Sequence, residues 1–432
     1  MRVLVTGATG FIGRALTEGL QRRGHEVIRA ARDPGPTQDS APSLRVDFAT
    51  VPSAQWWLPH LAGVQVVVNA VGILRERRGQ TFQALHTDAP VELFKACEQA
   101  QLGVVQISAL GADSRAASRY HLTKKAADDF LRALAPRGAV VQPSLVYGPG
   151  GASARLFNVL AALPVLALPA AGAPRVQPVH LDDLVAGVLA LVETAPPRMP
   201  TVAFVGPQPV ALRDYLRQLR SALGLGDRQW MLPLPARWFR WGARLAGRWP
   251  GSFLDGETAD MLLRSNTAPA EDFRRLLRHE PRAVNRFIEP EQAGPLRAQA
   301  LTGAYLPVLR VSLALLWLWT GVVSLGLYPV PESLALLARV GLHGALATFA
   351  LYAAAALDVA FGVLTLIAPP HWRRLMWAGQ LLLIAAYTLL ITVFLPEYWL
   401  HPYGPVSKNL PVAAAIALLW AMEPPRQRGT RR

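Results

Sequence analysis

The sequence predicts an α/β domain, a doubly wound parallel sheet with a small additional region, followed by an all-α bundle of four transmembrane helices. Three observations predict this. A short apolar run, residues 3–5, is followed by closely spaced glycines and then by helical spacing. Similar apolar runs alternate with helical stretches through the first 290 residues, whereas most of 307–422 is nearly free of charge. That last third explains why only 17% of the residues are charged, against about 25% in a typical soluble protein.

The first strand leads directly into a glycine-rich turn that contains Gly7, Gly10 and Gly13. Strand, glycine turn and helix together present free backbone N–H groups to a pyrophosphate, as in Rossmann-type folds. Gly7 permits the tight turn, Gly10 lets the phosphates approach the backbone, and Gly13 lets the helix lie close to the sheet. We therefore expect dinucleotide binding, with a purely structural glycine turn as the alternative.

The second strand is expected at residues 26–30, and its end carries Arg32 and Asp33. An arginine at this position suits the 2′-phosphate of NADP(H), whereas a carboxylate suits the ribose of NAD(H). Because Arg32 is the better placed, the sequence favours NADP(H), with NAD(H) as the alternative. Arg32 as a solvated loop residue is the simpler interpretation.

Three more apolar runs predict strands at residues 44–48, 64–68 and 104–108, and a helix is expected at 88–101. Asp47 ends the first of these runs and is suited to accept a hydrogen bond from the adenine amino group. The segment 69–72, with Ala70 and Gly72, suits close approach of the backbone to the cofactor. Such alternation predicts right-handed βαβ units and a parallel sheet.

Tyr120 and Lys124 are four residues apart, a spacing that places them on one face of a helix. The lysine ammonium is expected to lower the pKa of the phenol and to hold the nicotinamide ribose. Tyr120 is then suited to give or take a proton while a hydride moves. A tyrosine and a lysine at this spacing are common by chance. The pair indicates a catalytic site here because a glycine turn precedes it in the chain.

These motifs resemble short-chain dehydrogenases/reductases of the extended or atypical kind, over residues 1–290. The subgroup is similar to the nucleotide-binding accessory subunit of respiratory complex I. The residues that carry the resemblance are 6–13, 67–72, 107–112, Tyr120 with Lys124, and 143–149.

The resemblance implies a set of site residues. It implies cofactor contacts at Gly7, Thr9, Gly10, Phe11, Ile12, Gly13, Arg32, Asp47, Ala70, Gly72, Lys124 and Pro143. It implies catalytic roles for Tyr120, Lys124 and Ser108. Active members often carry paired serines, and this chain has Ser108 followed by Ala109. If Ser108 occupies the position of the family's catalytic serine, its hydroxyl orients the substrate. If Ala109 occupies that position, the hydroxyl is missing. Ser118 is a third, poorer candidate.

Two functions follow from these alternatives. The first is a membrane-tethered NAD(P)H-dependent oxidoreductase that acts on a lipid-like or quinone-like substrate. The second is a weakly active or inactive NADPH-binding protein that senses redox state or stabilises a membrane assembly. Intact Tyr120 and Lys124 favour the first, and the Ser108-Ala109 pair favours the second.

Residues 235–249 predict an amphipathic helix with two adjoining stripes. One stripe is basic, with Arg237, Arg240, Arg244 and Arg248, and the other is apolar, with Trp238, Trp241, Leu245 and Trp249. Such a helix suits the surface of an anionic membrane. The alternative is a helix that packs its tryptophans onto the neighbouring soluble region.

The expected domain division is a nucleotide-binding domain at 1–290, a linker at 291–306, a transmembrane domain at 307–423 and a basic cytoplasmic tail at 424–432. Spans are expected at 308–328, 344–367, 375–395 and 408–422, because about 20 apolar residues cross a bilayer as a helix. The fourth is the shortest. Residues 305–422 also resemble the DoxX-like membrane family through the segment Lys408-Asn409-Leu410-Pro411.

Arginines before the first span, between the second and third spans and after the fourth span predict a multi-pass cell-membrane protein with both termini in the cytoplasm. The net charge of +15 comes without a long basic run or a nucleic-acid motif, so we expect lipid and not nucleic acid as the partner. Cys97 is the only cysteine, which excludes an intrachain disulfide, and no metal site is expected. No cleavable signal peptide is expected.

One carboxylate, Asp358, falls within the second expected span, where burial of a charge is costly. The sequence suggests that it pairs with Lys408 inside the bundle, at a quinone-like or lipid-like site. A protonated Asp358 that bonds to a neighbouring helix is the alternative. The substrate and the oligomeric state are left open.

Overall fold

The computed structural model describes residues 1–35, 42–134, 137–169, 174–194, 200–226, 228–247 and 256–423. The chain divides into two compact units, Met1–Leu301 and Thr302–Arg432. The expected basic tail, 424–432, lies outside the described residues.

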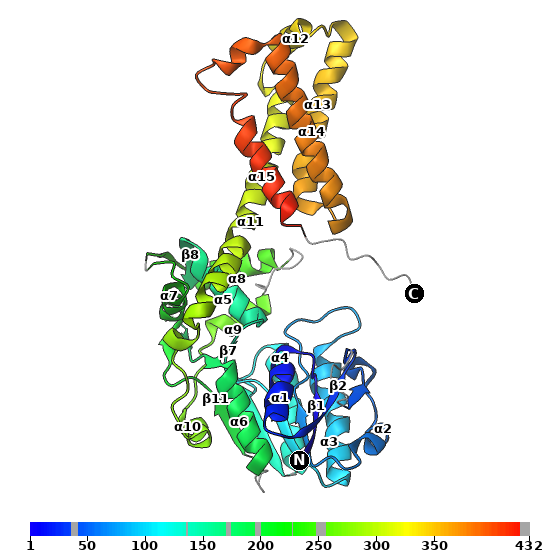
Figure 1. The fold of residues 1–432 in the computed structure, drawn as a ribbon, viewed down its shortest axis with the longest axis vertical. Coiled ribbons are helices and arrows are strands. Elements are labelled where there is room, and N and C mark those ends of the chain that lie inside the picture. The colour runs from blue at the N-terminus through cyan, green and yellow to red at the C-terminus, as the bar shows by residue number, and fades with distance from the viewer. Residues whose placement is uncertain are drawn as a thin grey trace. The chain divides into compact units, whose positions relative to one another are not determined.

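The first unit is organised around a seven-stranded parallel sheet with the strand order β11-β6-β5-β4-β1-β2-β3 (Figure 1). The strands are β11 (Thr201–Phe204), β6 (Gly138–Pro143), β5 (Gly103–Ile107), β4 (Val66–Asn69), β1 (Arg2–Thr6), β2 (Glu26–Ala31) and β3 (Ser43–Arg45). The order reverses between β1 and β4. Ligands of open parallel sheets bind at such a reversal, outside the carboxyl ends of the strands.

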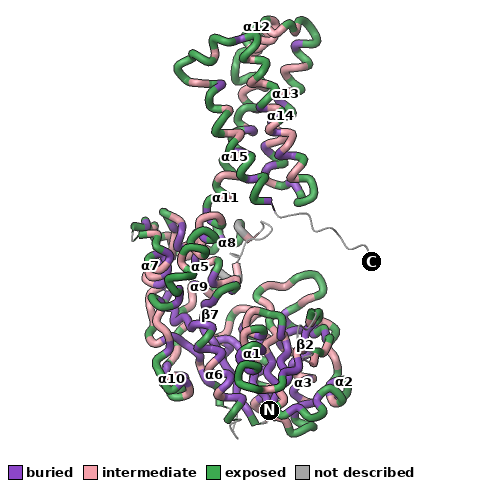
Figure 2. The backbone as a smooth tube through the Cα atoms, viewed as in Figure 1, coloured by how far each residue is buried: buried purple, intermediate pink, exposed green. Residues whose placement is uncertain are grey.

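Helices cover both faces of this sheet, as a doubly wound fold requires. One face carries α1 (Phe11–Arg22), α6 (Leu181–Thr194) and α10 (Glu271–Leu277), which bury Leu16, Val188 and Phe273 against the strands. The other carries α2 (Ala54–Trp57), α3 (Ala89–Gln99) and α4 (Arg119–Leu134). Figure 2 shows the buried backbone concentrated along the strands. The central strands are uniformly apolar because both of their faces are covered.

Several expected element boundaries differ from the structure, among them those of β3 and α3. The strand expected at 44–48 ends at Arg45, because the Asp47 carboxylate instead accepts a hydrogen bond from the N–H of Ala49 and begins the 3₁₀ turn Phe48–Thr50. The helix expected at 88–101 is preceded by a π-helical turn, Gln83–Asp88, and ends at Gln99.

The additional region of this unit consists of short strand pairs and helices placed beyond the sheet. The pairs join β7 (Val146–Tyr147) to β10 (Val179–His180), β8 (Val165–Pro169) to β13 (Trp230–Leu234), and β9 (Arg175–Val176) to β12 (Val210–Ala211). The helices are α5 (Ala152–Ala162), α7 (Leu212–Ala222), α8 (Ala236–Ala246) and α9 (Gly256–Leu263).

The second unit is helical, and among its described residues three helices are long and apolar enough to cross a membrane. These are α11 (Pro290–Val322, continued by a π turn to Leu327), α13 (Gly344–Ile367) and α14 (Pro370–Phe394). The residues expected as a linker, 291–306, belong to α11. Pro290 is the first residue of this helix, where the missing N–H costs no hydrogen bond.

The fourth apolar helix, α15 (Asn409–Ala421), is shorter than expected. Its 13 residues reach about 20 Å, less than the ~30 Å hydrocarbon core of a bilayer. It nevertheless belongs to the bundle, because Ile416 and Leu419 are buried with Leu313 of α11 and Trp377 of α14. A further short helix, α12 (Val330–Arg339), precedes α13.

The suggested ion pair between Asp358 and Lys408 is not formed. Asp358 is buried at 3% exposure, whereas Lys408 is exposed, and no ion pair joins them among the described residues. Lys408 lies at the N-cap of α15, at the end of the bundle. One polar contact that does form in the bundle interior joins Trp317, Gln380 and Thr365: the Trp317 indole donates to the Gln380 carbonyl at 3.0 Å, and the Gln380 amide donates to Thr365 at 2.8 Å.

Candidate functional site

The glycine turn lies at the carboxyl end of β1 and has no room for side chains at Gly7 and Gly13. Gly7 has a φ of +65°, and a Cβ there would lie 2.9 Å from the carbonyl oxygen of Ala70. A Cβ on Gly13 would lie 2.1 Å from the carbonyl oxygen of Gly7. The Gly10 N–H donates to the Gly7 carbonyl at 2.8 Å and closes the turn. The turn is thus a backbone cradle at the start of α1, which suits a pyrophosphate.

A buried hydrogen-bond chain ties together the ends of the three strands next to this turn. Thr6 of β1 donates to the side-chain oxygen of Asn69 of β4 at 2.6 Å, and the Asn69 amide donates to Gln106 of β5 at 2.7 Å. All three side chains are fully buried. The sequence analysis did not assign Thr6 and Gln106 this role, although a polar residue at the end of an apolar run is the signal that could have found them.

Lys124 of α4 reaches the same edge of the sheet. Lys124 is 3% exposed. Its ammonium donates hydrogen bonds to the carbonyl oxygens of Val71 and Ile107 at 3.0 and 3.1 Å. A Cβ on Gly72 would lie only 3.3 Å from this ammonium, so the absence of a side chain there leaves the lysine its space. Burial lowers the pKa of Lys124 to about 8. The structure thereby brings Lys124, Ala70 and Gly72 together with the glycine turn.

Tyr120 lies one turn before Lys124 on α4. Its ring makes edge contacts with Phe82, His86 and His121, with centroid distances of 6.0, 5.3 and 5.1 Å. The expectation that Lys124 lowers the pKa of this phenol is wrong for this structure. Burial, followed by the nearby Asp128 carboxylate, raises the pKa of Tyr120 to about 12. Loss of hydration is therefore the main cause of this shift.

Ser108 directly follows β5, and its hydroxyl is already engaged in a hydrogen bond. Its Oγ donates a hydrogen bond to the carboxylate of Asp128 on α4, and both residues are buried. Ala109 is also buried, and Ser118 lies 2.8 Å from the imidazole of His121. Burial raises the pKa of Asp128 to about 6. The sequence analysis missed Asp128.

His86 is a second residue that the sequence did not single out. It is fully buried, its Nε2 accepts a hydrogen bond from the Ile73 N–H at 3.0 Å, and its Nδ1 lies 3.2 Å from the Thr123 hydroxyl. Burial, followed by the charge of Lys124, lowers its pKa to about 2. The imidazole is therefore neutral and fixes the segment after β4 against α4.

The remaining expected cofactor residues lie along the carboxyl edge of the sheet. Arg32 is exposed immediately after β2, and Asp47 is exposed after β3. Thr9, Phe11 and Ile12 lie in the glycine turn and the first turn of α1, and Pro143 ends β6. Arg45, exposed at the end of β3 and paired in register with Ala31, is a second basic residue beside Arg32. The Asp47 carboxylate already caps the following turn.

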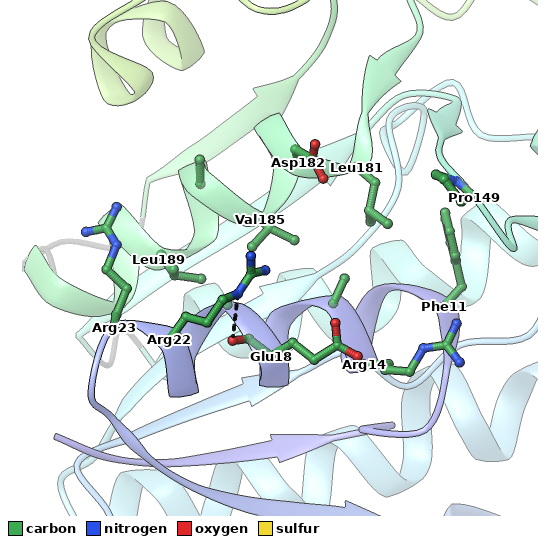
Figure 3. A pocket seen from close by; sticks show the side chains of 13 residues that line it. Phe11, Arg14, Glu18, Arg22, Arg23, Pro149, Leu181, Asp182, Val185 and Leu189 are labelled. Carbon is green, nitrogen blue, oxygen red and sulfur yellow. Dashed lines mark hydrogen bonds between the residues drawn. The ribbon is translucent and has the colours of Figure 1, made fainter. Parts of the chain in front are cut away.

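A groove of this unit lies elsewhere, between α1 and α6 (Figure 3). Its volume is about 560 Å³, and Arg14, Glu18, Arg22 and Leu189 are among the residues that line it. Of the expected cofactor residues only Phe11 reaches it, at the end nearest Pro149. The groove is therefore separate from the glycine turn.

Two family models match the chain. Residues 3–203 match the NAD dependent epimerase/dehydratase family, and residues 314–417 match the DoxX-like family. Among similar proteins, the ceramide reductase of Caulobacter vibrioides (strain NA1000 / CB15N) is 28% identical over 240 residues, which are 54% of this chain and 74% of that protein. The mitochondrial NADH dehydrogenase [ubiquinone] 1 alpha subcomplex subunit 9 of Mus musculus is 25% identical over 264 residues, 57% of this chain and 67% of that protein.

Solved structures show the same fold in the first unit. A nucleoside-diphosphate-sugar epimerase from Staphylococcus aureus aligns with a TM-score of 0.55 and 15% identity, covering 66% of this chain and 99% of that one. An NADPH-dependent quinone oxidoreductase from Escherichia coli, complexed with NADPH, aligns with a TM-score of 0.54 and 16% identity, covering 68% and 99%. The first unit is an NAD(P)-binding Rossmann fold. The chain thus combines a region that matches the NAD dependent epimerase/dehydratase family model with a region that matches the DoxX-like family model.

Proposed function

We propose that this protein is a membrane-tethered oxidoreductase of the short-chain dehydrogenase/reductase type that prefers NADP(H) and reduces a carbonyl group of a lipid-like substrate. The observation that carries the proposal is the placement of Lys124, which bonds to the ends of β4 and β5 beside the glycine turn, one helical turn from Tyr120. This arrangement sets an acid/base group next to the expected position of the nicotinamide ribose.

The residues at the glycine turn fit a dinucleotide, because the cradle excludes side chains at Gly7 and Gly13. In the proposal the bound dinucleotide supplies the hydride. The backbone N–H groups at the start of α1 bind its pyrophosphate, Lys124 holds its ribose, and Arg32 binds the 2′-phosphate. The preference for NADP(H) over NAD(H) is supported by the exposed arginine that follows β2.

Tyr120 is the proposed proton donor to the substrate oxygen. Its raised pKa of about 12 keeps the phenol protonated at neutral pH, which is the form that a reductase requires. Ser108, whose hydroxyl bonds to Asp128, acts in this proposal as a positioning residue. The Asp128 carboxylate in turn raises the pKa of Lys124 and so opposes part of the lowering that burial causes.

A lipid-like substrate is supported by two independent features. Three helices among the described residues are long and apolar enough to cross a membrane, which would tether the first unit to a bilayer. The similarity to a ceramide reductase supports a sphingolipid-type carbonyl compound as the first substrate class to test. A quinone remains the second class.

The proposed orientation places the first unit and both termini in the cytoplasm of a cell whose plasma membrane carries the helical unit. It is supported by Arg373 and Arg374, which lie in the first turns of α14 on the side shared with the end of α13. The expected tail arginines lie outside the described residues and add no structural support.

A second candidate function is an NADPH-binding sensor or assembly protein with little turnover. The contact between Ser108 and Asp128 favours it, because neither Ser108 nor Ala109 offers an unengaged hydroxyl to a substrate. The similarity to a subunit of NADH dehydrogenase also supports it.

The test measures NADPH oxidation by the full-length protein in lipid vesicles, with long-chain keto-lipids or a quinone as substrate. Tyr120→Phe should lower turnover by about 10²- to 10⁴-fold and leave NADPH binding intact. Tyr403→Phe, at an exposed tyrosine of the helical unit, is the matched control and should change neither. Tight NADPH binding without turnover on keto-lipids, quinones and total lipid extracts would refute the reductase and support the sensor.

A further inference from the structure

Exposed large apolar side chains occur on α8 and on β13, the strand that directly precedes it in the chain. We call this set the aromatic face and define it as Trp230, Leu232, Trp238, Trp241 and Leu245, whose exposures are 74, 51, 53, 60 and 44%. Soluble surfaces rarely place so many large apolar side chains together. The structure therefore removes the alternative in which these tryptophans pack onto the soluble region.

The helix itself is divided into three stripes. Ala243 is 1% exposed and marks the side that packs inward, and at 3.6 residues per turn Trp238, Trp241 and Leu245 lie opposite to it. A basic stripe of Arg237, Arg240 and Arg244, all exposed, runs between the two. Arg248 and Trp249, expected as members of the same stripes, lie outside the described residues.

We infer that the aromatic face and the basic stripe dock the nucleotide-binding unit on an anionic bilayer surface. Indole rings favour the boundary between headgroups and acyl chains, and arginines beside them bind lipid phosphates. The Arg237 guanidinium lies 5.9 Å from the Trp238 ring, which keeps the charge next to the aromatic group that it would accompany into the headgroup layer.

The bilayer is favoured over a protein partner by charge and by proximity. The exposed ionisable side chains among the described residues of α8 are all arginines, which complements anionic phosphates. Three helices in the described part of the same chain are long and apolar enough to cross a membrane, so the first unit is tethered to a bilayer.

A line of hydrogen bonds connects this surface to the loop that precedes Tyr120. Arg240 of α8 pairs with Asp260 of α9 at 2.7 Å. Just beyond α9, Arg264 pairs with Asp113 at 2.9 Å and donates to the carbonyl oxygen of Gly111. These contacts tie the segment between β5 and α4 to the elements that carry the aromatic face.

The experiment uses the full-length chain in vesicles. Cys97, the single native cysteine, is buried, so an environment-sensitive fluorophore can be placed on Leu245→Cys within the aromatic face. Glu98→Cys, exposed on α3, is the matched control position. Quenching by nitroxides attached to lipid acyl chains is measured in phosphatidylcholine vesicles with and without phosphatidylglycerol.

We expect strong quenching at position 245 and little at position 98 in vesicles that contain phosphatidylglycerol. The double variant Arg237→Glu/Arg244→Glu, which leaves Arg240 and its partner intact, should reduce the quenching at 245 to the level at 98. Equal quenching at the two positions in the unaltered chain, or quenching that responds neither to the anionic lipid nor to the double variant, overturns the inference.

Other occupants of this surface give a different signal. If another region of this chain, a second copy or a protein partner covers the aromatic face, the label at 245 is shielded from iodide in detergent micelles without phospholipid, and the inference fails. Quenching of the label does not depend on turnover, so a protein that docks but has no enzymatic activity still supports the docking inference. Failure of the proposed reductase function and failure of docking are thereby distinguished.

Discussion

The hydroxyl of Ser108 donates a hydrogen bond to the carboxylate of Asp128, which lies one helical turn beyond Lys124 on α4. Both partners are buried, at 4% and 0% exposure. The carboxylate acts on its surroundings in two ways: it raises the pKa of Lys124, opposing the effect of burial, and it raises that of Tyr120. Ser108 therefore influences the proposed acid/base pair through Asp128.

Ser108→Ala is expected to act mainly on stability. The variant leaves a buried carboxylate without its donor, which should cost about 1.5–3 kcal/mol of the free energy of unfolding, as for a hydrogen bond to a charged group. NADPH oxidation should fall less than in Tyr120→Phe. Denaturation and turnover of the full-length protein in detergent check both points.

Ser153→Ala is the control for this prediction, because the Ser153 hydroxyl donates to the uncharged carbonyl of Val146, and its loss should cost only about 0.5–1.5 kcal/mol. A Ser108→Ala protein as inactive as Tyr120→Phe, with unchanged stability, would instead show that the serine hydroxyl contacts substrate.

The part of the site that sequence could predict is local. The glycine turn and the spacing of Tyr120 and Lys124 each depend on fewer than about ten neighbouring residues within one strand, turn or helix. Asp128 could not be predicted in the same way. It lies 20 residues from Ser108, in a charged helical stretch that reads as solvent-facing, and its burial depends on how α4 packs against β5.

The same distinction holds for the helical unit. Length and hydropathy predict α11, α13 and α14 because those properties belong to single segments. The polar contacts between helices depend on which faces meet, and the sequence suggested Asp358 with Lys408 where the structure has Trp317 with Gln380. Likewise, the content of proline and glycine in 291–306 suggested a linker, although Gly294, Pro295 and Gly303 all lie within α11.

Arg32→Ala is expected to weaken NADPH binding by about tenfold, or about 1.4 kcal/mol, and to leave NADH binding nearly unchanged. The reason is that only NADPH carries the 2′-phosphate that an exposed guanidinium after β2 would bind. Fluorescence titration of both cofactors measures the two dissociation constants. Arg22→Ala, at the far end of α1, should alter neither. Equal weakening for both cofactors would contradict an Arg32 contact to the 2′-phosphate, and an effect at Arg45→Ala alone would move that contact to β3.

His86 should make the first unit less stable at acidic pH. Its pKa is lowered from 6.5 to about 2. Below pH 6.5 the imidazole therefore becomes protonated in the unfolded chain but stays neutral in the folded chain. The stabilisation is full above pH 6.5 and declines by ~1.4 kcal/mol for each pH unit below it. Asp128, whose pKa is raised to about 6, acts in the opposite direction: the folded state gains stability as the pH falls from about 6 toward 4.

The contribution of His86 is isolated by comparing the original protein with His86→Gln, whose side-chain oxygen can still accept the Ile73 hydrogen bond. Urea denaturation between pH 7 and pH 5 should show a smaller loss of stability in the variant. Parallel pH profiles for the two proteins would mean that the imidazole is not held neutral by burial.

Glu423 closes one end of the helical bundle, and its replacement should be among the most destabilising changes in that unit. Its carboxylate accepts from Arg310 of α11 at 2.6 Å and from the Trp377 indole of α14 at 3.3 Å, and it lies 3.6 Å from Arg373. Glu423 is 8% exposed, so Glu423→Gln leaves two arginines facing each other with their shared anion removed. A loss of about 3–5 kcal/mol is expected for breaking such a buried pair.

The control is Glu397→Gln, which breaks the pair with Arg339 in the same unit, because both of these side chains are about half exposed. An exposed pair contributes only ~0–1 kcal/mol, so this variant should melt close to the unaltered protein. Thermal unfolding of the full-length protein in detergent compares the two, and proteolysis near Asn409 reports whether α15 has detached. Equal melting of the two variants would mean that apolar packing of Ile416 and Leu419, without the ionic contact, holds α15 in the bundle.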